Sequence, residues 1–126
     1  SVAAGALREL QEEAGVAAKS LLLRGTISWS NFGPKREEWL GFIFLAEGWE
    51  GDLLSSNDEG SLVWVELDRL LQACALDAKT RAEADLPMWE GDRHFLPLVF
   101  DGDERQFHGS MPYDGDIPLD WNYQRI

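Results

Sequence analysis

Apolar residues near the start of the chain recur at the spacing of a helix. Residues 1–14 are mostly strong helix formers and contain no proline. The apolar positions that mark one face are Ala3, Leu7, Leu10 and Ala14. Gly15 follows directly, and glycine commonly ends a helix in the left-handed conformation. The pattern therefore predicts a helix over residues 1–14 that stops at Gly15.

Runs of apolar and β-compatible residues predict strands in the next part of the chain. Two such runs cover residues 21–29 and 39–46, and the polar segment 30–38 between them is typical of a loop. A polar, turn-rich stretch over residues 48–60 predicts an exposed loop. The short apolar run 62–67 then predicts a mostly buried strand.

The second half of the chain mixes helical and extended patterns. Residues 68–75 have helical spacing, and residues 79–86 suit either a short helix or an irregular loop. Residues 92–100 are ambiguous, because Pro97 suits a first helical turn or an edge strand.

Two further strands are expected at the end of the chain. They cover residues 104–113 and 117–126, and Asp114-Gly115-Asp116 between them is a hairpin signal. Strands mixed with a few helices in this order predict α+β or α/β layers. A length of 126 residues suits one domain over residues 1–126.

Composition and charge narrow the classes of function. The hydrophobic fraction of 44% and the six tryptophans indicate a folded globule. A net charge of −12 disfavours binding to nucleic-acid polymers, although its alternative role is solubility alone. No apolar run is long enough to span a membrane and no signal peptide is recognised. Because Cys74 is the only cysteine, no internal disulfide forms, and we expect a soluble, cytoplasmic protein.

The first helix carries an unusual group of acids. Glu9, Glu12 and Glu13 stand at positions i, i+3 and i+4, so their carboxylates share one face. Arg8 is placed to pair with Glu12, but one arginine does not neutralise three acids. Hard cations such as Mg²⁺ or Mn²⁺ prefer carboxylate oxygens and would relieve the repulsion. The alternative is an ordinary solvated acidic helix.

The wider pattern around these acids resembles a known family motif. Residues 8–16 read Arg-Glu-Leu-Gln-Glu-Glu-Ala-Gly-Val, which resembles the second half of the Nudix box. By spacing, the first glutamate of the box would fall immediately before Ser1 and its glycine six residues earlier. The strands that precede the box in the family also have no counterpart here. The resemblance implies a Nudix fold, a mixed β-sheet between helices in an α/β/α arrangement, without those N-terminal strands.

The same resemblance implies a chemistry for the acids. Nudix enzymes hydrolyse a nucleoside diphosphate linked to another group, with metals that offset phosphate charge and activate water. Glu9, Glu12, Glu13 and Glu59 are the expected ligands for Mg²⁺ or Mn²⁺, and Glu12, Glu13 and Glu59 the expected catalytic residues. Asp58 is a rival to Glu59, and both are alternatively ordinary loop acids.

A second resemblance concerns the substrate. The segments 88–92, 95–98 and 107–109 resemble the C-terminal part of oxidised purine nucleoside triphosphatases, which remove 8-oxo-dGTP from the nucleotide pool. In that subgroup a tryptophan stacks on the base and two adjacent acids contact the purine edge. Trp89 matches the tryptophan and Asp92 the second acid. Gly91 replaces the first acid, and Glu90 is a candidate substitute for it.

Two residues at the end of the first predicted strand, after the acidic helix, are further candidates for the substrate pocket. They are Trp29 and Asn31, and a core position is the alternative for both Trp29 and Trp89.

Three functions follow from these resemblances. The first is a metal-dependent pyrophosphohydrolase that converts a nucleoside triphosphate, such as 8-oxo-dGTP, to monophosphate and pyrophosphate. The second is a Nudix hydrolase of ADP-ribose or dinucleoside polyphosphates. The third is an inactive fragment or a non-catalytic nucleotide-binding module. The expected partner is a small nucleotide, with no nucleic-acid polymer and no membrane, and the oligomeric state is open.

Overall fold

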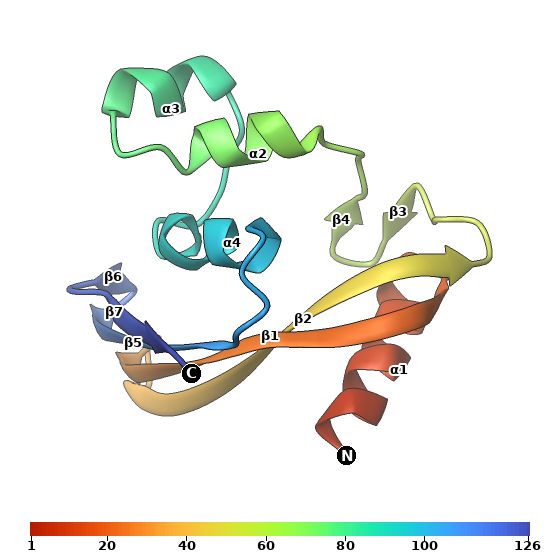
Figure 1. Cartoon of the computed structure of the whole chain (residues 1–126), viewed down its shortest axis with the longest axis horizontal. Helices are drawn as coiled ribbons and strands as arrows, with labels where there is room; N and C mark the ends of the chain where they lie inside the picture. Colours follow the sequence, from red (N-terminus) through yellow and green to blue (C-terminus); the bar gives the residue numbers. More distant parts are fainter. The chain divides into compact units, whose positions relative to one another are not determined.

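A mixed sheet and four helices make up the fold in the computed structural model, which describes all 126 residues (Figure 1). The elements are α1 (Val2–Ala14), β1 (Ala17–Phe32), β2 (Glu37–Glu50), β3 (Ser56–Asn57), β4 (Gly60–Ser61), α2 (Leu67–Ala73), α3 (Ala78–Ala84), α4 (Asp92–Phe100), β5 (Phe107–Gly115), β6 (Ile117–Pro118) and β7 (Asn122–Arg125). No helix combines the length and the apolar character that crossing a membrane requires.

Contacts group the residues into two compact units. The first unit contains residues 1–23 and 44–64, and the second contains residues 24–43 and 65–126. β1 and β2 run through both units, so each unit contains one end of these long strands.

In the first unit, α1 begins and ends with local hydrogen bonds. The Ser1 hydroxyl accepts from the Ala4 N–H at 3.1 Å, and the Gly15 N–H donates to the Gln11 carbonyl at 3.0 Å. Gly15 has φ 77°, a left-handed conformation that glycine adopts without steric cost. The predicted helix over residues 1–14 is confirmed.

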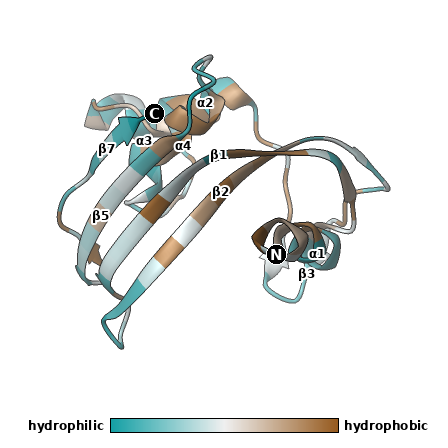
Figure 2. Ribbon diagram, turned by 60° about the horizontal axis from the view of Figure 1, so that its bottom comes forward, coloured by the Kyte–Doolittle hydropathy of each residue, from teal (hydrophilic) through white to brown (hydrophobic).

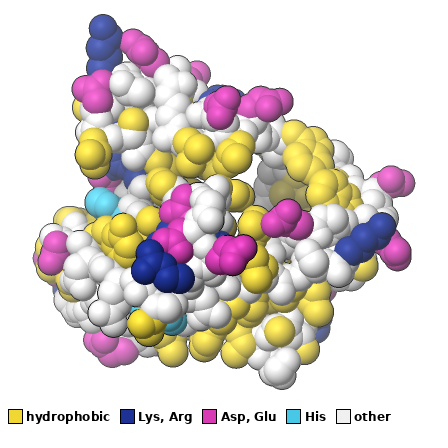
Figure 3. All heavy atoms as spheres, viewed as in Figure 1, with side chains coloured by type: hydrophobic (Ala, Val, Ile, Leu, Met, Phe, Trp, Pro, Cys, Tyr) yellow, Lys and Arg dark blue, Asp and Glu magenta, His cyan; other side chains and the backbone are white.

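The strand predicted over residues 62–67 is wrong. The strand pair in this region is the small hairpin of β3 and β4, in which Ser56 pairs with Ser61. The residues after β4 form no strand, and Val63 and Trp64 are largely exposed. Hydrophobic side chains gather at the surface near β3 (Figure 3). An apolar run becomes a strand only where a neighbouring strand offers hydrogen bonds, and its hydropathy alone does not supply one.

In the second unit, the sheet has the order β2-β1-β5-β6, and β7 also pairs with β5. β1 and β5 are parallel, with Gly25 opposite Phe107 and Trp29 opposite Met111, whereas β5 and β7 are antiparallel. Ile27, Phe107 and Met111 are fully buried. The predicted mixture of strands and helices is therefore confirmed as a mixed α+β fold.

The β1–β2 hairpin is longer than predicted. Its turn covers residues 33–36, so both ends of the predicted loop 30–38 belong to strands. The polar residues there are accommodated because their groups find partners: the Asn31 N–H donates to the Glu38 carboxylate at 3.1 Å. Figure 2 shows this hydrophilic tip and the more hydrophobic middle of both strands.

The helices of the second unit agree with the sequence patterns, apart from one proline. α2 packs against α3 and α4, and α4 buries Phe95 and Val99 one turn apart. The ambiguous segment 92–100 is thus a helix. Pro97 lies inside it and not in its first turn or on an edge strand.

The last predicted strand is interrupted. Residues 117–126 form β6 and β7, and both pair with β5. The expected hairpin is present, with Asp114 opposite Ile117. Between β6 and β7 the Trp121 ring lies on Gly109, where a Cβ would overlap it. The pairing with β5 resumes at Asn122, where β7 begins.

Candidate functional site

The acidic cluster of the first unit comes from the C-terminal half of α1. Glu9, Glu12 and Glu13 are exposed there, one helical turn apart. The Arg8 guanidinium lies 3.2 Å from the Glu12 carboxylate and 3.4 Å from that of Glu9. The predicted Arg8–Glu12 pair is therefore present, and the positive charge is shared with a second acid. Glu13 is left without a cationic partner among the ion pairs of the structure.

Asn57 connects Glu59, the fourth acid of the cluster, to the C-terminal end of α1. Its amide nitrogen donates to the Glu13 carbonyl at 3.0 Å, and its amide oxygen accepts from the N–H groups of Glu59 and Gly60 at 2.8 and 3.1 Å. The Leu54 N–H also donates to the Ala14 carbonyl at 3.0 Å. The sequence interpretation missed Asn57, although an asparagine before Asp-Glu-Gly is a common turn signal.

The charges of these acids act on one another. Partial desolvation raises the pKa of Glu13, and the carboxylates of Glu59, Glu9 and Glu12 raise it further. Of the two loop acids that compete for a role, Glu59 is the one whose charge raises this pKa. The cluster therefore has the excess negative charge that a cation would offset.

The donor set suits a hard divalent cation. All four side chains are carboxylates, the ligands that Mg²⁺ and Mn²⁺ prefer, and all are exposed. As the side chains lie, no three acids converge on one point. Exposed glutamates rotate about three side-chain bonds, so these carboxylates are free to change position.

In the second unit, a cavity of about 370 Å³ collects most of the residues expected to bind the substrate. Trp29 from β1 and Trp89, Asp92 and Tyr113 from other segments line it. Trp89 is 79% exposed, so the alternative that it belongs to the core is wrong. Trp29 is half-buried and contacts Gly41, where a Cβ would overlap its ring.

Asn31 lies outside the lining of this cavity. It has a left-handed conformation with φ 53°, and its amide nitrogen donates to the Tyr113 carbonyl at 3.2 Å. Asn31 therefore connects the ends of β1 and β5 behind the cavity wall.

The polar groups of the cavity differ in their freedom to bind. Burial raises the pKa of Asp92, the acid that begins α4. Glu90 also lines the cavity, but its carboxylate forms an ion pair with Arg93. Burial, and then the charge of Asp92, raise the pKa of Tyr113. Tyr113 is thus buried and Asp92 half-buried in the lining of the cavity, and the sequence interpretation missed Tyr113.

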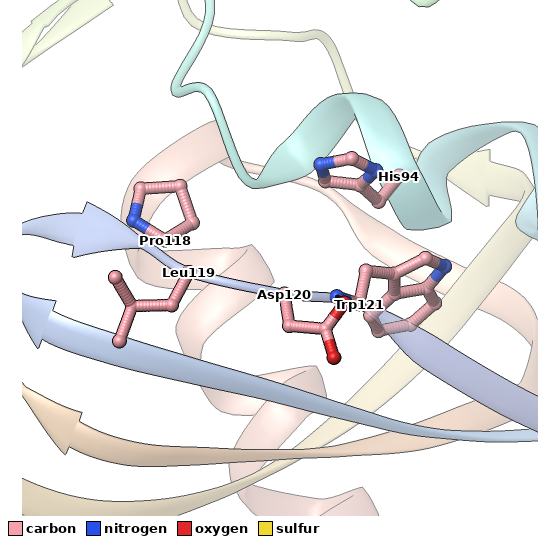
Figure 4. Close-up of a pocket in the computed structure, with 5 residues that line it drawn as sticks. All are labelled: His94, Pro118, Leu119, Asp120 and Trp121. Carbon is pink, nitrogen blue, oxygen red and sulfur yellow. Dashed lines mark hydrogen bonds between the residues drawn. The ribbon is translucent and has the colours of Figure 1, made fainter.

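A smaller cavity of about 300 Å³ lies in the same unit, between α4 and the segment that follows β6 (Figure 4). His94 projects from α4 and stacks on Trp121, with ring centroids 6.3 Å apart. Partial burial and then the positive charge of Arg93 lower the pKa of His94.

Comparison with known proteins identifies the family. The NUDIX domain profile matches residues 1–98. The uncharacterized Nudix hydrolase YvcI of Bacillus subtilis (strain 168) is 26% identical over 121 residues, covering 94% of this chain and 68% of that protein. The crystal structure of the mutator protein MutT from Bacillus halodurans matches with a TM-score of 0.76 and 28% identity, covering 98% of this chain and 74% of that one. The chain therefore belongs to the Nudix family, whose domain acts on diphosphate bonds of small nucleotides and generally uses divalent metal ions.

Proposed function

We propose that this protein hydrolyses nucleoside triphosphates to monophosphate and pyrophosphate, with a preference for an oxidised purine such as 8-oxo-dGTP. One observation carries the proposal. Trp29 lines a single cavity in the second unit together with Trp89 and Asp92, from which it lies far away in the sequence. Two indole rings and one acid are the groups that a purine base requires for stacking and for readout of its edge.

The acidic cluster supplies the chemical part of the proposal. Glu9, Glu12, Glu13 and Glu59 would hold Mg²⁺ or Mn²⁺. A bound cation offsets the charge of the triphosphate and lowers the pKa of the attacking water. Glu59 assists the other ligands or accepts the proton of that water. Asn57 orients Glu59 through the backbone N–H at 2.8 Å.

The cavity residues would select the base. Trp89 projects into solvent and is therefore free to stack on a ring, which contributes about 1–3 kcal/mol for one base. The ionised carboxylate of Asp92 accepts hydrogen bonds from the N–H groups of a guanine-type edge.

A panel of nucleotides tests the substrate. The full chain with Mg²⁺ is given 8-oxo-dGTP, dGTP, ADP-ribose and a dinucleoside polyphosphate, and kcat/KM is measured for each. We expect the highest value for 8-oxo-dGTP and pyrophosphate as its second product. A preference for ADP-ribose would reject the roles of Trp89 and Asp92. Ligand-induced stabilisation without turnover of any nucleotide would show a non-catalytic binding module.

Substitution of the acids tests the chemistry. In Glu12→Gln and Glu13→Gln we expect kcat/KM to fall by about 100-fold or more, since charge stabilisation worth several kcal/mol is lost with a ligand. The thermal midpoint should stay constant or rise, because one repulsive charge is removed. Glu83→Gln on α3 is the matched control, an exposed acid with no assigned role. Full activity of both α1 variants would contradict the mechanism.

A further inference from the structure

The cavity that we propose to bind the base, called the base cavity below, has one buried tyrosine in its lining. Tyr113 is 8% exposed and lines the cavity from β5. The backbone carbonyl of Tyr113 accepts a hydrogen bond from the side-chain amide of Asn31. The Tyr113 hydroxyl, in contrast, has no side-chain hydrogen-bond partner in the protein. No fully enclosed side-chain nitrogen or oxygen of the protein lacks a hydrogen-bond partner, so this unpartnered hydroxyl is not fully enclosed. It is therefore open to a ligand in the cavity.

Gly91 and Tyr113 fit together in space. A Cβ at position 91 would overlap the Tyr113 hydroxyl and lie 2.7 Å from Met111 Sδ. Gly91 has φ −69°, a conformation open to every residue, so the backbone does not require glycine here. A side chain at this position would have to displace the Tyr113 hydroxyl and Met111 Sδ. The Tyr113 hydroxyl occupies the place where an acid at position 91 would begin.

We propose that Tyr113 is a specificity-determining residue whose hydroxyl donates a hydrogen bond to the oxygen at position 6 of a guanine-type base. The inference rests on the proposed function and adds to it the group that reads this oxygen.

The chemistry of the two polar groups supports the assignment. An ionised Asp92 only accepts hydrogen bonds, so it suits the ring N–H and the amino group of guanine but repels the oxygen at position 6. That oxygen requires a donor, and the Tyr113 hydroxyl is the neutral donor beside Asp92. Its raised pKa keeps it protonated at neutral pH.

The test uses an analogue that changes one atom of the base. 6-Thio-dGTP keeps the ring N–H and the amino group of dGTP, but its sulfur is a weak acceptor. We expect kcat/KM of the wild-type protein to be higher for dGTP than for 6-thio-dGTP. In Tyr113→Phe, kcat/KM for dGTP should fall by roughly three- to tenfold, which corresponds to the loss of one hydrogen bond. The loss should appear as a higher KM and not as a lower kcat. The value for 6-thio-dGTP should stay nearly constant, so the preference disappears.

The other tyrosine of the chain provides the control. Tyr123→Phe removes the same hydroxyl from a side chain that is 48% exposed and does not line the base cavity. It should keep the wild-type preference. Gly91→Ala should weaken the preference for dGTP over 6-thio-dGTP, because its Cβ displaces the Tyr113 hydroxyl. In a protein that already carries Tyr113→Phe, the added Gly91→Ala should leave this preference unchanged. An unchanged preference in Tyr113→Phe overturns the inference.

A binding measurement separates this inference from the proposed function. If the wild-type protein hydrolyses no purine triphosphate, the proposed function fails. The affinities for dGMP and 6-thio-dGMP, measured by tryptophan fluorescence without metal, then decide the role of Tyr113. Tighter binding of dGMP that Tyr113→Phe abolishes supports the inference. Equal affinities for the two nucleotides, or no binding of either, overturn it.

Discussion

Asn57 shows how one side chain connects two acids that are distant in the sequence. Its amide donates to the carbonyl of Glu13 and accepts from the N–H of Glu59, so both halves of the amide are used. The first bond fills one of the carbonyl groups that every helix leaves free at its C-terminus. The second holds the turn that carries Glu59. The position of Glu59 relative to α1 therefore depends on a neutral residue.

Replacement of this amide tests the connection. In Asn57→Ala we expect the Mg²⁺ concentration for half-maximal activity to rise and kcat/KM to fall by about tenfold, the range seen when groups behind a ligand are lost. Titration of activity with Mg²⁺ measures both values. Asn122→Ala, at an exposed position of β7, is the control. Identical Mg²⁺ curves for the wild type and Asn57→Ala would show that Glu59 needs no such support.

At the scale of the element, the C-terminal end of α1 is shaped by the Gly15 turn and by its contacts with Leu54. Gly15 turns the chain with φ 77°, and a Cβ there would lie 2.8 Å from Leu54 Cγ. The Leu54 N–H, from the segment after β2, donates to the Ala14 carbonyl beside this turn. The end of α1 thus contacts the segment that leads to Asn57 and Glu59.

Two glycines of α1 give opposite predictions for one substitution. Gly15→Ala should lower the free energy of unfolding by about 1–2 kcal/mol, because alanine resists the left-handed conformation. Gly5 lies inside the helix with open space at its Cβ, so Gly5→Ala should raise that free energy by about 1 kcal/mol. Urea unfolding measures both. Equal effects of the two variants would refute this account of the helix end.

At the scale of the whole molecule, long-range polar ties hold the second unit. Arg24 on β1 is only 4% exposed, and its guanidinium donates to the carbonyls of Val99, Leu98 and Asp103 at 3.0, 3.3 and 2.6 Å. Its charge faces Asp101 at 3.6 Å. One side chain thus joins the centre of the sheet to the end of α4 and the turn before β5.

Loss of this guanidinium should be costly. In Arg24→Met we expect the free energy of unfolding to fall by about 3 kcal/mol, because buried carbonyls lose their donors. Arg105→Met is the comparison, since Arg105 is exposed and solvent screens its ion pair with Asp103. Urea denaturation separates the two cases. A similar small loss in both would show that the Arg24 network adds little.

The sequence predicted the parts of the molecule whose information is local. The spacing of Glu9, Glu12 and Glu13 defines one helix face whatever the helix contacts, and Gly15 marks the end of that helix. Helical and extended patterns likewise located most elements, because side-chain periodicity follows from backbone geometry. The apolar run over residues 62–67 misled the prediction, because strand formation depends on a partner strand.

Only the tertiary structure decided which distant residues meet. Asn57 reaches Glu13, and Tyr113 fills the space left by Gly91, through contacts between segments that no spacing rule connects. Trp89 was ambiguous in the sequence because an indole suits both a core and a binding surface, and its exposure decided between them. The sequence by itself determined the acidic face of α1 and the class of fold. The base cavity required the packing of β1, β5 and α4, because its shape belongs to no single segment.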